Sequence, residues 1–240
     1  RLLIEQWESI KDHKRSYAHV EFSKLFYKND LSGYPMSGTL NDIKKLKLED
    51  LIDYYQKVVL NNDLKIVING HIELYMDDIM RDLKIKPLEK SLDINFKFRN
   101  HKLNHIKEEK TKMHQAIIKL GFLYPIYRFD ELYEAARCVD TMLGGYPDSR
   151  LFKEIREKQG LCYDISSDYD FYKGGLLISS GVASHQKNHA LKAIINEVTV
   201  LKNDGVSLDE LNQAKAYLIH QIKSSLDSQT YITKRAFLKT

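Results

Sequence analysis

Residues 144–163 read GGYPDSRLFKEIREKQGLCY, and they carry the strongest local signal for the fold of this chain. The glycine pair at their start ends a helical pattern whose apolar side chains share one face, namely Leu132, Ala136, Val139 and Leu143. A second helix is predicted to begin near Asp148 or Ser149. Arg156 falls late in that helix, and Tyr163 falls where a strand begins. The stretch therefore predicts two helices and a strand in close succession.

Further strands and helices are predicted on both sides of this stretch. Residues 163–169 and 175–182 have the pattern of two strands joined by a turn at residues 172–174, and residues 116–122 form an earlier strand. Two helices follow the hairpin, one over residues 191–201 and one that opens with the capping-box spacing of Ser207 and Glu210. Because strands and helices are mixed with a hairpin, we expect an α+β fold.

The first third of the chain is predicted to be mainly helical. The expected elements are helices over residues 1–28 (with a break near residues 12–15), 39–58 and 72–83, and a buried strand over residues 64–70. The polar segment 86–90 contains one of only four prolines and is the best candidate for a linker. We therefore expect two domains, 1–85 and 86–240, the first lacking its beginning and the second truncated at its C-terminus.

Composition limits the classes of partner. The net charge of +4 is small against 37 basic and 33 acidic side chains, so the sequence predicts no nucleic-acid partner. Apolar runs are far shorter than the roughly 20 residues that span a bilayer, so no membrane partner is expected either. Two cysteines, Cys138 and Cys162, cannot form a disulfide framework, and reduced thiols indicate a cytoplasmic protein. The start at Arg1 lacks both Met and a secretory signal, so we expect a fragment.

The histidines do not form a zinc motif. A hydrolytic zinc site needs imidazoles on one helix face, a third ligand and an acid that accepts a proton from the bound water. None of the nine histidines belongs to H-x-x-E-H or H-E-x-x-H. The pairs His101 with His105 and His185 with His189 have i, i+4 spacing, but no carboxylate lies between their members. We therefore expect solvated histidines and no metal site in this chain. Neither a G-x-S-x-G elbow nor a phosphate-binding glycine loop is present.

The opening stretch resembles a signature of the pitrilysin/insulinase family of zinc metallopeptidases, to which the mitochondrial processing peptidase belongs. That signature is a glycine pair, S-R-L-F and then R-E-K-x-G-L-x-Y, as in residues 144–163. Residues 205–211 resemble the family's G-V-(S/T)-x-x-E-L helix start, which Ala214 and Lys215 follow. Residues 34–70 are similar to the latter part of the family's preceding domain. The resemblance thus spans most of the 240 residues.

The resemblance implies a fold and a site. The implied fold has two homologous α/β sandwich domains of the LuxS/processing-peptidase-like metallohydrolase type, packed around a peptide-holding chamber, with the first domain incomplete here. Arg156 and Tyr163, spaced R-x6-Y, match the pair that holds the backbone carbonyl of the substrate beside zinc. A guanidinium and a phenol are strong donors that can polarise a carbonyl. From the residues alone, Arg156 could equally pair with Glu154 or Glu157, and Tyr163 could be ordinary packing.

Three hypotheses about function remain open at the level of sequence. The first is a substrate-holding half of a zinc-dependent peptidase, inactive alone, which binds peptide beside a partner half that supplies zinc. The expected assembly is with a second peptidase-like subunit or as a homo-oligomer. The run Asp12–Arg15 departs from the usual acidic, proline-containing continuation of active members, which favours this hypothesis. The second is a fragment of an active peptidase whose zinc motif precedes Arg1. The third is a non-enzymatic scaffold that binds peptides.

Overall fold

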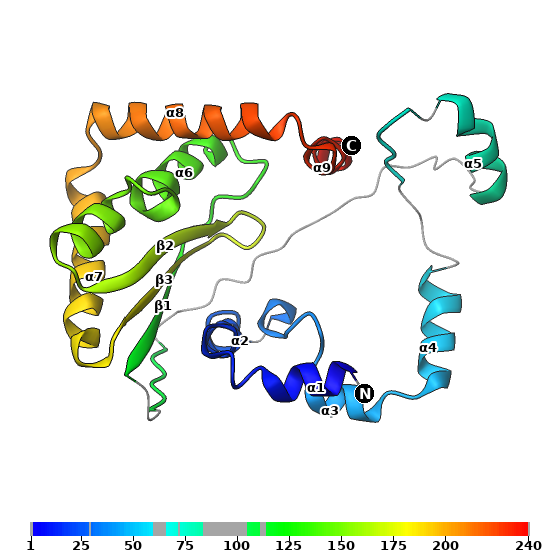
Figure 1. The fold of residues 1–240 in the computed structure, drawn as a ribbon, viewed down its shortest axis with the longest axis horizontal. Helices are drawn as coiled ribbons and strands as arrows, with labels where there is room; N and C mark the ends of the chain where they lie inside the picture. Colours follow the sequence, from blue (N-terminus) through cyan, green and yellow to red (C-terminus); the bar gives the residue numbers. More distant parts are fainter. Residues whose placement is uncertain are drawn as a thin grey trace. The chain divides into compact units, whose positions relative to one another are not determined.

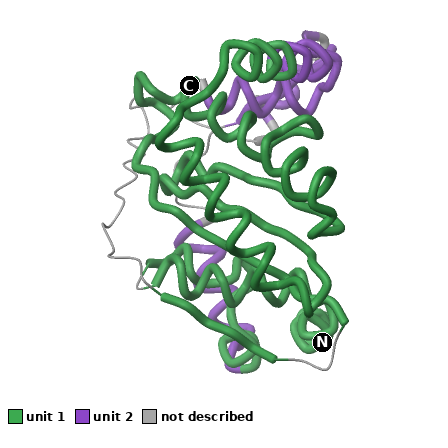
Figure 2. Tube along the Cα trace, turned by 90° about the vertical axis from the view of Figure 1, so that its left-hand side faces the viewer, with its two compact units in different colours: residues 1–44, 96–218 green, residues 45–95, 219–240 purple. Residues whose placement is uncertain are grey.

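The computed structural model of the chain describes residues 2–28, 30–59, 66–71, 73–83, 105–110 and 114–239. The chain divides into two compact units, shown in different colours in Figure 2. Unit 1 comprises residues 1–44 and 96–218, and unit 2 comprises residues 45–95 and 219–240. The domain boundary predicted between residues 85 and 86 lies outside the described residues and stays a prediction.

Unit 1 is built on an antiparallel sheet of three strands. They are β1 (Gln115–Leu123), β2 (Cys162–Asp170) and β3 (Gly175–Ala183), in the order β1-β3-β2 (Figure 1). The hairpin predicted between residues 163 and 182 is therefore confirmed. Its turn needs glycine, because Gly174 has a φ of 64° and donates its N–H to the Asp170 carbonyl at 2.8 Å. The observed hairpin therefore agrees with both the strand periodicity and the turn residues of the sequence.

Helical segments cover one face of this sheet and form the main core with it. They are α6 (Tyr133–Asp140), η4 (Thr141–Gly145), η5 (Phe152–Lys158), α7 (Lys187–Asp204) and, up to residue 218, α8 (Leu208–Ser225). Short 3₁₀ turns, η6 (Ser184–Gln186) before α7 and η1 (Leu31–Gly33) nearer the N-terminus, complete the unit. The side chains buried most completely against the sheet are Leu143, Leu151, Ile155, Val182, Ala190 and Ile194. The mixed helix and sheet structure predicted from the sequence is confirmed.

Local sequence explains how these elements begin, end and approach one another. Ser207 caps α8: its hydroxyl accepts from the Glu210 N–H at 3.2 Å, and the Glu210 carboxylate accepts from the Ser207 N–H at 2.8 Å. Gly205, with a φ of 74°, ends α7. A Cβ on Gly144 would lie only 2.5 Å from the backbone nitrogen of Ser167. Only glycine therefore lets η4 pack this closely on β2.

On the other face of the sheet, α2 (Lys14–Phe26) packs on β1. The chain also forms α1 (Leu2–Ser9) before α2 and α3 (Leu40–Lys45) after it. The helix break predicted near residues 12–15 is confirmed, because α1 and α2 are separate helices. The ring of Phe26 fills the space above Gly121 and Gly175, where a Cβ would lie 2.4 Å and 3.0 Å from ring atoms. Trp7 Nε1 donates to the Gly38 carbonyl at 2.9 Å, and this hydrogen bond links α1 to the loop that precedes α3.

The regular secondary structure that is described in unit 2 is helical. The helical segments are α4 (Leu48–Tyr54), η2 (Tyr55–Val59), η3 (Glu73–Tyr75), α5 (Met76–Leu83), the end of α8 and α9 (Gln229–Lys239). The buried strand predicted over residues 64–70 is wrong for residues 66–70, which form no strand, and residues 64 and 65 lie outside the described residues. A strand is stable only beside a partner, and the described part of unit 2 contains no strand that could pair with this segment.

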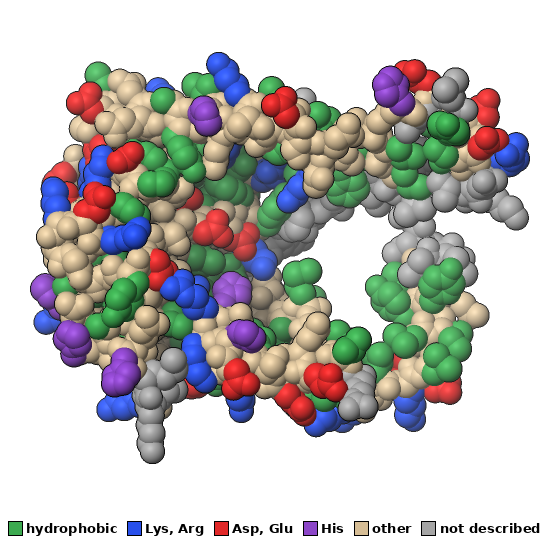
Figure 3. Space-filling model, in the orientation of Figure 1, with side chains coloured by type: hydrophobic (Ala, Val, Ile, Leu, Met, Phe, Trp, Pro, Cys, Tyr) green, Lys and Arg blue, Asp and Glu red, His purple; other side chains and the backbone are tan. Residues whose placement is uncertain are grey.

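Over the part of unit 1 that faces the viewer in Figure 3, acidic and basic side chains are interspersed rather than segregated. Among the described residues, no helix is both long enough and apolar enough to span a bilayer.

Candidate functional site

Arg156 lies on the exposed side of η5, directly after a buried anchor. Ile155 is fully buried in the core, whereas Arg156 is exposed. The guanidinium carbon of Arg156 lies 4.5 Å from the centroid of the Phe152 ring. Glu154 is paired with Lys158 at 2.6 Å, so the alternative in which Glu154 pairs with Arg156 is not what the structure shows. The helix thus holds the Arg156 head group at the surface on a rigid base.

Tyr163 stands at an irregularity in β2. Cys162 lies opposite Val182, but Asp164 lies opposite Gly181, so one strand has an extra residue at this point. Such a β-bulge breaks the alternation of side chains and re-aims one of them. Cys162 is buried in the core, and the Tyr163 side chain is 56% exposed. Tyr163 is therefore not a packing residue, which was the alternative left open by its sequence.

The short turn that joins η5 to β2, with Arg156 before it and Tyr163 after it, forms a corner of unit 1. The Leu161 N–H donates to the Ile155 carbonyl at 3.0 Å, and Gly160, with a φ of 60°, makes the tight turn between helix and strand. The Arg156 charge also reaches the start of β2. Burial raises the pKa of the Cys162 thiol, and Arg156 partly opposes that shift. The residues of the R-x6-Y pattern therefore lie on two elements: Arg156 is near the end of a helix, and Tyr163 is at the bulge where β2 begins.

An ion pair beside Tyr163 was not predicted from the sequence. Arg15 of α2 binds Asp164 through both guanidinium nitrogens, with Nη1 and Oδ2 2.6 Å apart. The hydrogen bond from Arg15 lowers the pKa of Asp164 below its usual range, and the Arg156 charge adds to this effect. Gly181 leaves the space for the pair, since a Cβ there would lie 2.5 Å from Asp164 Oδ1. Local patterns carry no signal for partners 149 residues apart.

A second ion pair links the two motifs that the sequence singled out. Arg150 Nε donates to Glu210 Oε1. Arg150 Nη2 donates to Glu210 Oε2 and to the Gly205 carbonyl, and both of these bonds are 2.9 Å long. The bond from Arg150 lowers the pKa of Glu210 to about 2. This ion pair therefore links the segment just before η5 to the first turn of α8.

The described residues do not fit a zinc ion. No group of three His, Cys, Asp or Glu side chains among them is arranged to hold a metal. His185 lies in η6 and His189 in the first turn of α7, both on the surface. His101 lies outside the described residues, so its predicted relation to His105 remains a prediction. We therefore assign no step of chemistry to a metal bound by this part of the chain.

Comparison with known proteins gives the family. The family described as "Peptidase M16 inactive domain" matches residues 45–218. The chain is 25% identical over 232 residues to "Probable inactive metalloprotease YmfF" of Bacillus subtilis, which covers 95% of this chain and 54% of that protein. It is 27% identical over 240 residues to "Uncharacterized zinc protease YmxG" of the same organism, with 95% and 56% covered. The chain belongs to the peptidase M16 family, as residues 144–163 predicted.

Solved structures share the fold. A conserved protein from Enterococcus faecalis is 24% identical and superposes with a TM-score of 0.79 over 98% of this chain and 56% of that chain. A peptidase M16 inactive domain from Pseudomonas fluorescens is 20% identical, with a TM-score of 0.73 over 98% and 57%. The chain spans about half the length of the curated relatives it matches. The matching family domain is the inactive one, which agrees with the absence of H-x-x-E-H from these 240 residues.

Proposed function

We propose that this chain is the substrate-holding half of a zinc-dependent peptidase of the M16 family. In this proposal Arg156 and Tyr163 bind a backbone carbonyl of the peptide, and a partner half supplies the zinc ion. The partner that supplies zinc is a second peptidase-like subunit that carries the zinc motif. The observation that carries the proposal is that Arg156 and Tyr163 are both exposed on either side of one short turn, each directly after a buried residue, Ile155 and Cys162.

The chemistry of the corner supports this role. Within the described part of the chain, the polar ends of Arg156 and Tyr163 have no hydrogen-bond partner. A guanidinium and a phenol that are free to donate can both bind one carbonyl oxygen and stabilise negative charge that develops on it. The stacking on Phe152 restricts the Arg156 side chain, so less conformational entropy is lost when a ligand binds.

A peptide would bind this corner most simply as an added strand. Among the described strands, β2 is an outer strand of the sheet, and Tyr163 stands at its beginning. Outer strands present unpaired N–H and C=O groups, and an extended peptide can pair with them largely independently of its sequence. The donors of Arg156 and Tyr163 would then fix which carbonyl of the peptide lies at the corner.

Binding of a fluorescent unfolded peptide to the isolated chain tests the proposal without a partner. Hydrogen bonds to charged groups contribute about 1.5–3 kcal/mol, so Arg156→Ala should weaken binding by about 10-fold or more. Tyr163→Phe removes one neutral donor, and an effect of about 3-fold to 10-fold is expected. Fluorescence anisotropy measures both. Lys158→Ala, on the same helix, and Tyr75→Phe, with 59% exposure close to that of Tyr163, are matched controls.

Activity gives the second half of the test. The purified chain should contain no stoichiometric zinc by elemental analysis and should not cleave peptides. A partner carrying H-x-x-E-H should cleave them only when the chain is added, and both substitutions should reduce the rate of that pair. Stoichiometric zinc in the isolated chain contradicts this division of labour. Unchanged activity of the pair with both variants would instead support a non-enzymatic scaffold.

The alternative function is that of a part of a longer, active M16 peptidase, and the length of the relatives favours it. The chain spans about half the length of its curated relatives, one of which is described as a zinc protease. In this alternative the residues belong to a longer M16 chain in which two homologous α/β sandwich domains, here 1–85 and 86–240, enclose the substrate. The corner of Arg156 and Tyr163 then has the same role, and the zinc motif precedes Arg1. The gene sequence upstream of Arg1 decides between the two arrangements.

A further inference from the structure

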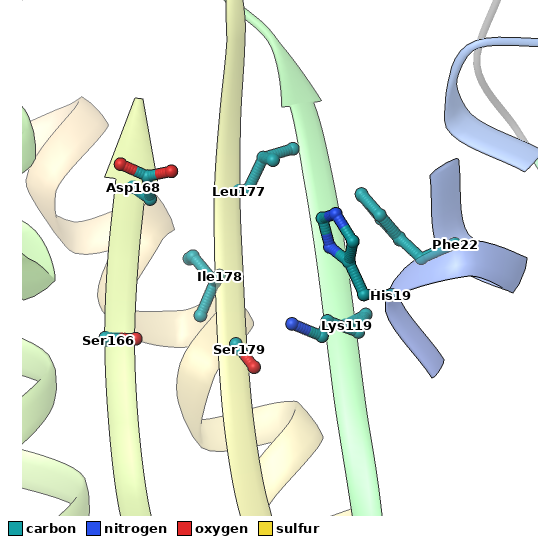
Figure 4. Close-up of a pocket in the computed structure, with 8 residues that line it drawn as sticks. All are labelled: His19, Phe22, Lys119, Ser166, Asp168, Leu177, Ile178 and Ser179. Carbon is teal, nitrogen blue, oxygen red and sulfur yellow. The ribbon is translucent and has the colours of Figure 1, made fainter. Parts of the chain in front are cut away.

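A cavity of about 230 Å³ lies between α2 and the sheet of unit 1, and it includes neither Arg156 nor Tyr163. Figure 4 shows His19 and Phe22 of α2 on one side and residues of all three strands on the other. Phe22 and Leu177 give the cavity an apolar part. Engineered cavities of about 150 Å³ admit benzene, so this cavity is large enough for a small organic ligand.

The sheet register fixes the order of the polar groups in the cavity. Lys119 of β1 lies opposite Ser179 of β3, and Ser179 lies opposite Ser166 of β2, so these residues form one row across the sheet. Asp168 lies further along β2, opposite Leu177. Because neighbouring strands are about 4.8 Å apart, the backbones of β1 and β2 are separated by about 10 Å. A basic group and an acidic group therefore approach the cavity from opposite edges of the sheet.

These two charged groups act on each other but do not pair. The Asp168 charge favours the ammonium form of Lys119, yet no ion pair within 4.0 Å joins them. Among the described residues, neither charged group has a hydrogen-bond partner, and the same holds for Ser166 and Ser179. Ser166 and Asp168 are exposed, and Lys119 and Ser179 are half-buried. The two hydroxyls and the two charges can therefore be reached from solvent and are not occupied by protein groups.

The surroundings leave one positive and one negative charge in the cavity. Partial desolvation, together with the charges of Lys119 and Lys173, lowers the pKa of His19, which disfavours a third charge beside Lys119 and Asp168. Arg15 and Asp164 neutralise each other. Burial also lowers the pKa of Lys119, and the Arg15 charge adds to that shift. A bound anionic group would offset this cost.

We propose that this cavity binds a free α-amino acid as a zwitterion, with its carboxylate at Lys119, its ammonium group at Asp168 and an apolar side chain against Phe22 and Leu177. The hydroxyls of Ser179 and Ser166 donate to the carboxylate. A simple anion can pair only with Lys119 and a simple cation only with Asp168, whereas a ligand with both charges can pair with both groups and gains two charge-assisted hydrogen bonds. This inference goes beyond the proposed peptide corner and does not depend on it.

Calorimetric titration of the chain with L-leucine tests the proposal, with N-acetyl-leucine and leucinamide as matched probes. Each analogue lacks one of the two charges, so each should bind at least about 10-fold more weakly than leucine. Lys119→Gln and Asp168→Asn should each weaken leucine binding to the same extent. Lys192→Gln, an exposed change on α7, should leave it unchanged.

The outcomes separate the alternatives. Absence of leucine binding by the unaltered chain overturns the proposal, as does equal binding of leucine and N-acetyl-leucine, which indicates an anion site. Inorganic phosphate that binds in a Lys119-dependent manner while leucine does not also overturns it. Far-UV circular dichroism checks that each variant is folded, and a saturation-transfer spectrum of leucine reports binding independently of heat. Because the Arg156 and Tyr163 variants retain this cavity, they should still bind leucine.

Discussion

The two faces of the sheet in unit 1 have different chemistry although they share the same strands. The face under α6, α7 and α8 is packed with apolar side chains. Val182 on β3 and Ile194 on α7, which packs against this face, have no exposed surface. The face under α2 contains a cavity with Lys119 and Asp168 in it. Close packing contributes most to stability, whereas the polar groups of the α2 face are exposed or half-buried and remain in contact with solvent. One face therefore holds the fold together, and the other is available for binding.

The largest expected effect comes from an identical change at adjacent positions of β3. Leu176 belongs to the packed core, and Leu177 lines the cavity. Leu176→Ala should reduce the free energy of unfolding by about 2–4 kcal/mol because it leaves a void in a close-packed interior. Leu177→Ala should reduce the free energy of unfolding by about 1 kcal/mol, because the half-buried Leu177 side chain loses less protein contact when it is shortened. Urea denaturation measures both, and equal losses would mean that the two faces do not differ.

Two carboxylates on the packed side should respond to pH in opposite directions. Burial raises the pKa of Asp140 to about 6, and its bond from Ser167 only partly opposes this. Stability should therefore rise as pH falls from above 6 towards 4, by at most about 3 kcal/mol, and Asp140→Asn should remove that rise. Glu210, with its pKa lowered to about 2, contributes stability that is lost as pH falls from about 4.5 to 2.

Urea midpoints measured from pH 8 to pH 3 check these two predictions. Asp204→Asn, an exposed change at the end of α7, serves as a control and should keep the normal profile. A profile of Asp140→Asn that matches the unaltered chain would show that Asp140 titrates normally.

Two glycines test the difference in packing directly. A Cβ on Gly144 would meet the backbone nitrogen of Ser167 at 2.5 Å, and backbone cannot move away without disturbing β2. Gly144→Ala should therefore cost about 1–3 kcal/mol. On the α2 face, a Cβ on Gly181 would meet only the ends of the Asp164 and Arg15 side chains. Gly181→Ala should cost under about 1 kcal/mol. Thermal and urea unfolding of the two variants decide the order, and a reversed order contradicts the proposed difference between the faces.

The smallest effect is expected at the ion pair of the α2 face. The side chains of Arg15 and Asp164 are 63% and 38% exposed, so Arg15→Met should change the free energy of unfolding by less than about 1 kcal/mol. High salt should reduce even this difference, because exposed charges are screened. Unfolding at low and at high salt measures it. A salt-independent loss above about 2 kcal/mol would mean that α2 is held mainly by this pair.

Elements with strong local signals were predicted well from the sequence. The turn at Gly174, the cap at Ser207 and the helix end at Gly205 each depend on residues within a few positions of one another. The strand predicted over residues 64–70 was wrong for its described part because β-branched content does not supply a neighbouring strand. The corner of Arg156 and Tyr163 was found through the spacing of a family signature. Its bulge was not found, because a register shift depends on the partner strand.

The sequence by itself determined the family, the order of most elements and the absence of H-x-x-E-H, since all three are written in short stretches of neighbouring residues. Only the tertiary structure decided that Arg15 pairs with Asp164, that Arg150 pairs with Glu210, and that Lys119 and Asp168 share one cavity. These groups come from distant positions, and their energies depend on burial and distance, which arise only when strands pair and helices pack.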